Sequence, residues 1–366
     1  KRLRRQGYDV ETAESGERAL DLIAAKAPDL VISGLDLQGM TGRDLCRQVN
    51  ERPEWRSIYF IMLTSDDSQQ EVVATLDAGA DEYLIKPINV RELIARVQAG
   101  LRIVSLQQDL SAANLRLNEA LRQIDNELRV VAGIQRALLP QALPHSDTLR
   151  FGVFYQPSTQ CGGDYYDIYP LSPSVFGLVI ADVSGHGAPA MVAMALVRLL
   201  FHSYASAAAS PADLLGVLNN QLYRHLPTEQ YATMFFGALD SATGLLTYSS
   251  AGQPPPLFCC AATGEIASLP NCEGFPLKLV MPDVEYQNHT LQMAPGDKLL
   301  LYTDGVNEMM DPEGELYGFE RLCDSVGACM ALPPQERIER IAEDLRTFAR
   351  GYPQSDDVTM LWADLS

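Results

Sequence analysis

A seven-residue repeat of apolar side chains runs through the middle of this 366-residue chain and divides it into three parts. The apolar members of the repeat are Leu110, Leu117, Ile124, Val131 and Leu138. Leu121 and Leu128 fill the intervening seam, and Gln107 and Asn114 are its polar members. A repeat of about four heptads is typical of a coiled coil, and a single seam Asn fixes the register of a parallel pair. We therefore predict a homodimer through residues 103–138; the alternative is a long connecting helix packed on its own domains.

The repeat separates two segments of different character. We predict an α/β domain over residues 1–99, a coiled-coil linker over 100–140 and a third domain over 141–366. Pro140 and Pro144 end the linker helix, because proline cannot continue it. Hydrophobic residues make up 47% of the chain and charged residues 20%, so both flanking segments can bury a core.

The first segment alternates short apolar runs with amphipathic runs. The predicted strands are 8–12, 30–33, 57–64 and 82–85, and the predicted helices are 16–27, 41–50, 70–78 and one from 89. Such alternation indicates a parallel, doubly wound α/β sheet. Residues 1–7 resemble the end of a helix with a Gly stop, so we expect an N-terminally truncated domain without its first strand.

The last segment mixes strands and helices without strict alternation. Strands are predicted at 175–180, 231–239, 245–249, 298–302 and 358–362, and helices at 188–205, 211–225 and 334–348. Elements that cluster in this way indicate an α+β domain built on a β-sandwich.

The net charge limits the classes of binding partner, and the cysteines indicate the cellular compartment. The chain has 28 basic and 47 acidic residues, a net charge of −19, which argues against binding to nucleic acid or to an anionic membrane. The apolar run at 191–201 is interrupted by Arg198 and is too short to span a bilayer. Seven cysteines without CxxC spacing indicate reduced thiols, and we predict a cytoplasmic protein.

Four acidic segments in the last part share one form, an Asp beside Gly or another small residue where a predicted strand begins or ends. They are Gly162-Gly163-Asp164, Ala181-Asp182-Val183-Ser184-Gly185-His186-Gly187, Tyr302-Thr303-Asp304-Gly305 and Ser355-Asp356-Asp357-Val358-Thr359. A single Asp-Gly is usually only a turn. Several carboxylates that converge at a sheet rim repel one another unless a cation neutralises them, and oxygen-only ligands suit Mg²⁺ or Mn²⁺. The four segments together therefore indicate a metal site.

These segments, with Ile-Gln-Arg-Ala-Leu-Leu-Pro at 134–140, resemble the metal-dependent Ser/Thr phosphatases of the protein phosphatase 2C type. Within that type they resemble the bacterial branch named after stage II sporulation protein E. The resemblance covers about residues 130–366. It implies hydrolysis by water activated between two divalent ions, Mn²⁺ or Mg²⁺, without a covalent enzyme intermediate.

The same resemblance implies a role for each aspartate. Asp182 would bridge the two ions. Asp304 and Asp356 would complete one site, and Asp164 and the Val183 carbonyl would complete the other. No other cofactor is expected.

Three further residues are interpreted on the same basis. Asp357 would support the site without binding metal. His186 would either donate a proton to the leaving alkoxide or stabilise its turn, because the candidate acid position of the eukaryotic relatives is Ser184 here. Gln253 stands where the family often has His and is interpreted as structural.

Residues 1–99 resemble a two-component receiver domain. The resemblance rests on Ala-Gly-Ala-Asp-Glu-Tyr-Leu-Ile-Lys-Pro at 78–87, on Thr64 at a strand end, and on the strand leading to Gly42. Lys86 and Thr64 would contact a phosphoryl group, but the acceptor position is Gly34. We therefore predict that this domain is not phosphorylated by the usual route and acts in docking or dimerisation.

The resemblances imply a phosphatase in bacterial signal transduction that acts on a phosphorylated anti-sigma-factor antagonist. The alternative is a non-catalytic adaptor that binds a sigma factor or its regulator. Such adaptors lose ligand aspartates, whereas all four are present here. A DNA-binding regulator is disfavoured by the acidic charge.

Overall fold

The computed structural model describes residues 1–66 and 68–366. The chain forms two compact units, Lys1–Gln123 and Ile124–Ser366, and each has its own hydrophobic core.

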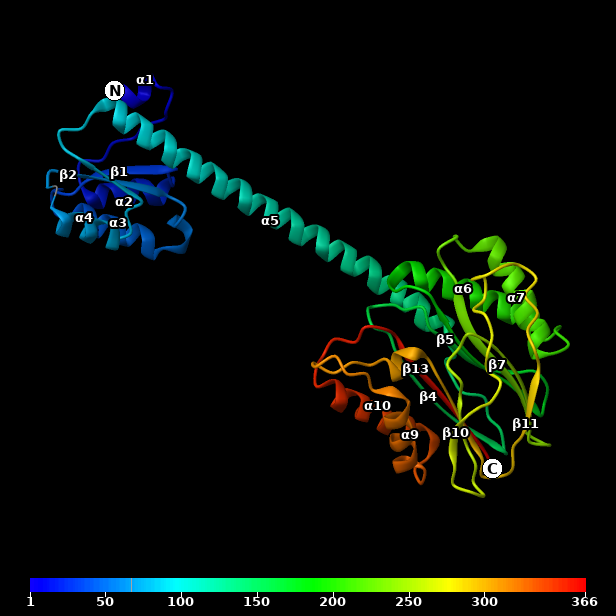
Figure 1. The fold of residues 1–366 in the computed structure, drawn as a ribbon. Coiled ribbons are helices and arrows are strands. Elements are labelled where there is room, and N and C mark those ends of the chain that lie inside the picture. The colour runs from blue at the N-terminus through cyan, green and yellow to red at the C-terminus, as the bar shows by residue number, and fades with distance from the viewer. Residues whose placement is uncertain (67) are drawn as a thin grey trace. The chain divides into compact units, whose positions relative to one another are not determined.

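The first unit is built on a parallel three-stranded sheet in the order β1-β2-β3 (Figure 1). Its strands are β1 (Leu30–Gly34), β2 (Tyr59–Thr64) and β3 (Glu82–Ile85), and its short helices are α1 (Arg2–Arg5), α2 (Gly16–Ala25), α3 (Gly42–Glu51), η1 (Pro53–Trp55) and α4 (Gln69–Asp77). One core cluster joins α2 and α3 to one face of the sheet through Ile23 and Leu45. A second cluster on the other face includes Val97 of the helix that follows. Helices on both faces make this the expected doubly wound α/β arrangement.

The prediction of a strand at residues 8–12 is wrong. Residues 8–13 have no regular secondary structure, and the three-stranded sheet contains no neighbour that pairs with them. A short strand is stable only with a hydrogen-bonded partner. Tyr8 instead packs against the core cluster that contains Ile61, Leu84 and Val97.

A single helix, α5 (Val90–Leu138), spans 49 residues and includes the whole heptad repeat. It begins after Asn89, whose side-chain oxygen accepts a hydrogen bond from the Arg91 amide at 2.9 Å. The seam residues Leu110 and Leu117 are 63% and 57% exposed. The middle of the seam is thus exposed, whereas Val131 and Leu138 near the end of α5 pack against a small cluster that contains Cys161 and Met191. A coiled coil over the exposed part of the seam stays a prediction.

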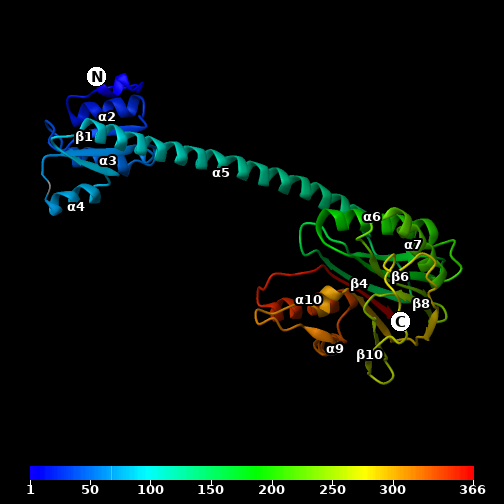
Figure 2. The same ribbon diagram turned by 45° about the horizontal axis from the view of Figure 1, so that its top comes forward.

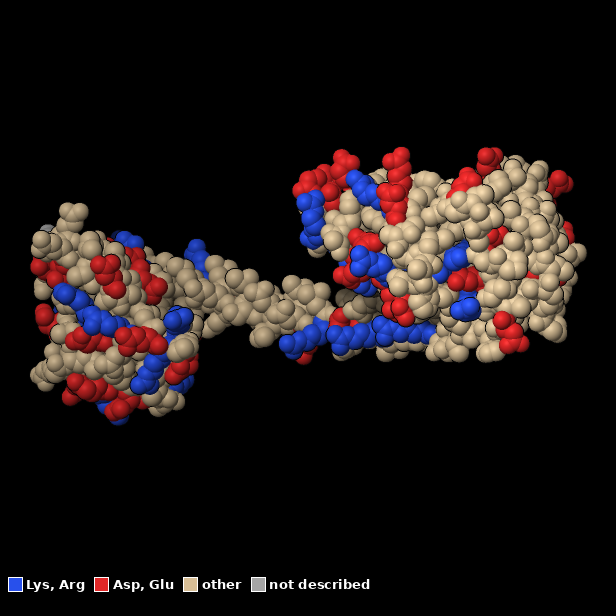
Figure 3. Space-filling view, turned by 90° about the horizontal axis from the view of Figure 1, so that it is seen from below, with Lys and Arg blue, Asp and Glu red and all other residues tan. Residues whose placement is uncertain are grey.

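Charged side chains on α5 lie away from the apolar seam. Arg122, Arg129 and Arg136 are exposed and each follows a seam position by one residue. Figure 3 shows basic side chains in a row along this helix. In a helix that pairs with another helix, the seam positions are apolar and the charged side chains lie outside the seam. The side chains of α5 follow this distribution.

The second unit contains two five-stranded sheets that pack face to face (Figures 1 and 2). The first sheet has the order β10-β9-β12-β13-β4 and the second has the order β11-β8-β7-β6-β5. The strands are β4 (Leu149–Gln156), β5 (Tyr165–Pro170), β6 (Val175–Val183), β7 (Ala232–Asp240), β8 (Leu245–Ala251), β9 (Leu257–Cys259), β10 (Ile266–Ser268), β11 (His289–Gln292), β12 (Lys298–Tyr302) and β13 (Val358–Leu365). All the pairings that these sheets contain are antiparallel.

Helices cover the outer face of each sheet. They are α6 (Gly187–Tyr204), α7 (Pro211–His225), α8 (Asp304–Asn307), α9 (Gly318–Cys329) and α10 (Pro334–Ala349). Figure 2 shows α6 and α7 outside one sheet and α9 and α10 outside the other. This is the predicted α+β sandwich, with strand β12 and helix α7 at the predicted residues.

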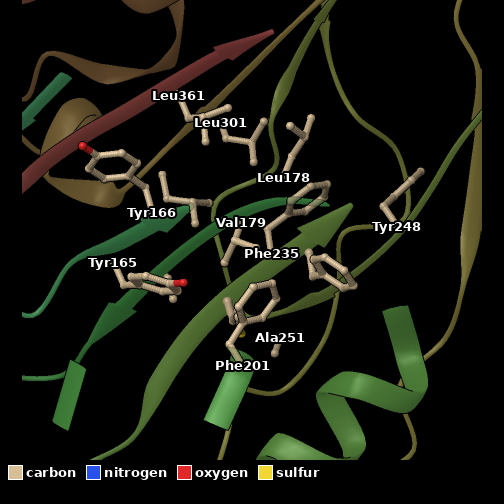
Figure 4. Packing of buried hydrophobic residues seen from close by; sticks show 14 of the residues in the cluster. Tyr165, Tyr166, Leu178, Val179, Phe201, Phe235, Tyr248, Ala251, Leu301 and Leu361 are labelled. Carbon is tan, nitrogen blue, oxygen red and sulfur yellow. The ribbon is translucent and has the colours of Figure 1, made fainter. Parts of the chain in front are cut away.

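Neighbouring side chains on β6 point to opposite faces of their sheet. Leu301 and Leu361 of the first sheet meet Leu178 of the second in the core between the sheets (Figure 4). Val179, the next residue along β6, points to the opposite face, where Phe201 of α6 packs. Side chains alternate along a strand, so every second residue faces the same side of the sheet. This alternation decides which polar residues at the end of a strand face the space between the sheets.

Helix α6 has the length and mean hydropathy, 1.2, of a membrane span. It is longer than the apolar run seen in the sequence, since the helix continues through the small residues before Met191. Its inward face packs Met194, Val197 and Phe201 into the core, as the helices of a folded core do.

Candidate active site

Four chain segments that bear aspartates meet at one end of the sandwich. On β6, Asp182 lies on the same face as Leu178 and Ile180, which face the other sheet. The first sheet contributes Thr303 and Asp304 after β12, and Asp356 and Asp357 before β13. The register of the strands thus brings together residues that are far apart in the sequence.

Asp164, just before β5, is completely buried. Its Oδ2 atom accepts hydrogen bonds from the hydroxyls of Thr303, at 2.9 Å, and Thr359. Its Oδ1 atom is buried and has no hydrogen-bond partner among residues 1–66 and 68–366. Burial raises the pKa of Asp164 well above its ordinary value, and the charges of Asp182 and Asp357 raise it further. One oxygen of this carboxylate is therefore held in place while the other is free to bind a ligand.

Asp182 is the central carboxylate of the cluster. Burial raises its pKa from 3.8 to about 8, and the negative charges of Asp304, Asp356 and Asp357 add to the shift. A carboxylate in this position needs either a proton or a cation at neutral pH.

Asp304 and Asp356 flank Asp182 from the other sheet. Burial raises the pKa of Asp304, and nearby Glu308 raises it further. Burial also raises the pKa of Asp356, against a hydrogen bond from the Asp357 amide at 2.8 Å that lowers it. The Oδ1 atom of Asp304 is buried without a partner, like that of Asp164.

Asp357 supports the backbone around Asp164. Its Oδ1 accepts a hydrogen bond from the Ser158 amide at 2.7 Å, and its Oδ2 accepts one from the Gly163 amide at 2.7 Å. Both carboxylate oxygens are thus used by the protein itself. This arrangement agrees with a supporting role for Asp357.

Glycine is required where these segments cross. A Cβ atom on Gly162 would lie 1.7 Å from Oδ2 of Asp357, and one on Gly163 would lie 2.4 Å from the Val183 carbonyl oxygen. A Cβ on Gly305 would lie 2.0 Å from the Asp357 carbonyl oxygen. The glycines beside the aspartates therefore permit close approach of backbones, and the Val183 carbonyl lies against the Asp164 loop.

The donor chemistry of the cluster fits hard divalent cations. Every candidate donor is oxygen, two buried carboxylate oxygens lack partners, and the clustered negative charge raises the pKa values. As the side chains stand, however, no three or more His, Cys, Asp or Glu side chains among residues 1–66 and 68–366 are gathered closely enough to hold one ion. The residues present thus fit the cations chemically but do not form a finished ligand cage.

Other residues singled out in the sequence have structural contacts. Ser184 accepts a hydrogen bond from the Tyr231 amide at 3.0 Å. Gln253 is buried, donates to the Tyr302 carbonyl at 3.0 Å and accepts from the Thr233 hydroxyl at 2.6 Å, so it ties the two sheets together. Exposed His186 precedes α6; burial raises the pKa of Asp356, and nearby His186 acts against that shift.

Sequence reasoning missed three residues that position the acidic cluster. Thr303 and Thr359 hold Asp164, and Gln135 at the end of α5 hydrogen-bonds to Gly162. The two threonines lie within the aspartate segments that the sequence indicated. Their spacing carries no sign of the contact, because Thr359 is 195 residues from Asp164.

The first unit brings together the remnants of a receiver site. The position of a Cβ on Gly34 lies 3.8 Å from the Lys86 ammonium nitrogen. Thr64 is buried, and its hydroxyl accepts a hydrogen bond from the Asp66 amide at 3.1 Å. Asp36 is exposed, with its backbone carbonyl oxygen 3.7 Å from the same Cβ position. The acceptor position therefore holds no carboxylate.

Sequence comparisons match both units to known families. The family model described as stage II sporulation protein E matches residues 172–366, and the response regulator receiver domain model matches residues 1–98. The chain is 26% identical over 242 residues to phosphoserine phosphatase RsbU of Bacillus subtilis, a match that covers 66% of this chain and 70% of that protein.

Solved structures resemble the second unit. The SiaA-PP2C domain of Pseudomonas aeruginosa gives a TM-score of 0.59 at 23% identity, covering 68% of this chain and 99% of that domain. The RsbU and RsbW domains of a Mycobacterium tuberculosis protein give a TM-score of 0.54 at 25% identity, covering 62% and 63% of the two chains. The likeness to the SiaA-PP2C domain shows that the second unit has the PP2C fold.

Proposed function

The chain belongs to the stage II sporulation protein E family of PP2C-type protein phosphatases, and on this premise we propose that it removes phosphate from phosphoserine or phosphothreonine in a regulatory protein with the help of two divalent cations. It is a protein-serine/threonine phosphatase that carries a response regulator receiver domain. We assign the receiver to residues 1–99, the linker to 100–140 and the phosphatase domain to 141–366.

The observation that carries this proposal is the buried acidic cluster. Asp182, with a pKa of about 8, lies among carboxylates whose pKa values are also raised, and the Oδ1 atoms of Asp164 and Asp304 lack partners. We assign Asp182 to both cations, Asp304 and Asp356 to one, and Asp164 with the Val183 carbonyl to the other.

The chain's own residues would hold this site in place for the reaction. Thr303 and Thr359 fix one oxygen of Asp164 and leave the other free for a ligand. Asp357 holds the Gly163 backbone at 2.7 Å. The cations, Mn²⁺ or Mg²⁺, would supply neutralisation of the negative charge that develops on the phosphate oxygens.

The substrate that we propose is a phosphorylated anti-sigma-factor antagonist. The support is the likeness to phosphoserine phosphatase RsbU. We further propose that the protein is cytoplasmic and forms a parallel dimer through residues 103–138, since the seam residues Leu110, Leu117, Leu121 and Ile124 in the middle of α5 are apolar and exposed. The receiver, without an acceptor carboxylate at Gly34, would serve in docking or dimerisation.

The test is Mn²⁺-dependent hydrolysis of an aryl phosphate and of a phosphoserine peptide. We expect Asp182→Asn and Asp304→Asn to lower kcat/KM by about 100-fold or more, because each removes a charge that holds the cations. Exposed Asp147 of the same unit offers the matched control, and Asp147→Asn should keep the parental rate.

The alternative, a non-catalytic adaptor, predicts a different result. Equal rates for the parent, Asp182→Asn and Asp304→Asn would mean that the hydrolysis comes from a contaminant, and the proposed function would be wrong.

A further inference from the structure

Gln135 connects the linker helix directly to the loop that carries Asp164. The side chain lies on the last turn of α5 and is only 2% exposed. Its Nε2 donates to the Gly162 carbonyl at 2.9 Å, and its Oε1 accepts from the Gly162 amide at 3.0 Å. A primary amide that pairs with both groups of one backbone residue fixes that residue in two directions, because both hydrogen bonds must keep their geometry.

The Gly162 loop is held from its other side by Asp357. The Gly163 amide donates to Oδ2 of Asp357 at 2.7 Å, and a Cβ on Gly162 would collide with the same oxygen. The loop is thus clamped between Gln135 and Asp357 immediately before Asp164. The hydrogen bonds of Gln135 to Gly162 and of Asp357 to Gly163 both fix the backbone before Asp164, so Gln135 contributes to the position of Asp164.

The heptad seam gives Gln135 a second significance. It follows Leu128 by seven residues and therefore continues the seam that contains Asn114 and Leu121. Leu121 is 54% exposed, whereas Ala132, one turn before Gln135, is buried against Cys161 and Met191. The helix face that is open to a partner helix upstream is occupied downstream by the phosphatase domain's own acidic loop and α6.

We propose that Gln135 is a positioning residue that sets the cation affinity of the acidic site by holding Gly162, which makes the end of the linker helix a part of that site. The inference rests on the proposed two-cation function. Residues that hydrogen-bond to the support of a metal ligand typically change metal affinity by about 10- to 100-fold when they are replaced.

The test measures Mn²⁺ binding to the full chain by titration of the free-Mn²⁺ electron paramagnetic resonance signal. Gln135→Met keeps the length of the side chain but removes both hydrogen bonds. We expect its Mn²⁺ dissociation constant to rise about tenfold, while kcat at saturating Mn²⁺ stays within about threefold of the parent. Gln98→Met makes the same chemical change at an exposed position of the same helix and should alter neither quantity.

A purely structural role would give a different pattern. If Gln135→Met unfolds at the assay temperature, Gln135→Asn, whose amide is one methylene shorter, replaces it in the same titration. An unchanged dissociation constant in a folded variant, or a loss of kcat that saturating Mn²⁺ does not restore, would overturn the inference alone. Absence of Mn²⁺ binding by the parent chain would overturn the proposed function and this inference with it.

Discussion

Burial of like charges governs the residues of the acidic cluster. The pKa of Asp182 is about 8 in the folded, cation-free chain and near 3.8 when the group is free in water. The folded state therefore binds this proton more tightly than the unfolded state does. The associated stability is fully present below about pH 4 and is lost as the pH rises through about 8.

Asp182→Asn should consequently stabilise the cation-free protein at high pH. At pH 8 we expect the variant to exceed the parent by about 1–3 kcal/mol in free energy of unfolding, because it removes a buried charge. The difference should shrink toward pH 4. Thermal unfolding in a chelator at several pH values checks this, and a difference that does not change with pH would contradict it.

Gly162 and Gly133 should respond in opposite ways to replacement by alanine. Gly162→Ala places a Cβ 1.7 Å from Oδ2 of Asp357, so we expect the Asp164 loop to shift and activity to fall by about 100-fold or more. Gly133 lies in α5 with nothing within 4 Å of its Cβ position, and Gly133→Ala should stabilise the helix by about 0.5–1 kcal/mol.

Hydrolysis rates and chemical denaturation of both variants give the measurement. Equal rates for Gly162→Ala and the parent would show that the loop tolerates displacement.

Regular elements could be predicted from the sequence wherever local signals agree. Helix α7 begins at Pro211 after Ser210, whose side chain accepts a hydrogen bond from the Asp213 amide. The range 8–12 has the composition of a strand but no partner, because pairing depends on segments far away in the chain.

The candidate site was predictable only in part for a related reason. Strand ends and Asp-Gly segments indicated the aspartates as a group. The contacts of Thr303, Thr359 and Gln135 depend on how the sheets and α5 pack, which spacing does not reveal.

Among the secondary-structure elements, α5 is the one through which we propose that the chain dimerises. Its seam residue Leu117 is 57% exposed in the single chain, and burial in a helix pair would remove that apolar surface from water. Leu115, two positions away, is 70% exposed but lies off the seam.

We therefore expect Leu117→Asp to convert a dimer to a monomer at micromolar concentration, because a buried pair of carboxylates would oppose association. Leu115→Asp should leave the dimer intact. Sedimentation velocity distinguishes the two, and a monomeric parent chain would show that the heptads do not pair.

At the scale of the whole molecule, a phosphoryl donor could act on this chain only through an acceptor side chain in the receiver domain. Gly34 occupies the acceptor position beside the Lys86 ammonium, and a glycine has no side chain to form an acyl phosphate. Incubation with acetyl phosphate and Mg²⁺ should therefore leave the intact mass and the phosphatase rate of the parent unchanged. Lys86→Ala should behave identically, because Lys86 has no phosphoryl group to bind. A stable adduct on residues 1–98 that disappears with Asp36→Asn would mean that the exposed Asp36 carboxylate replaces the missing acceptor.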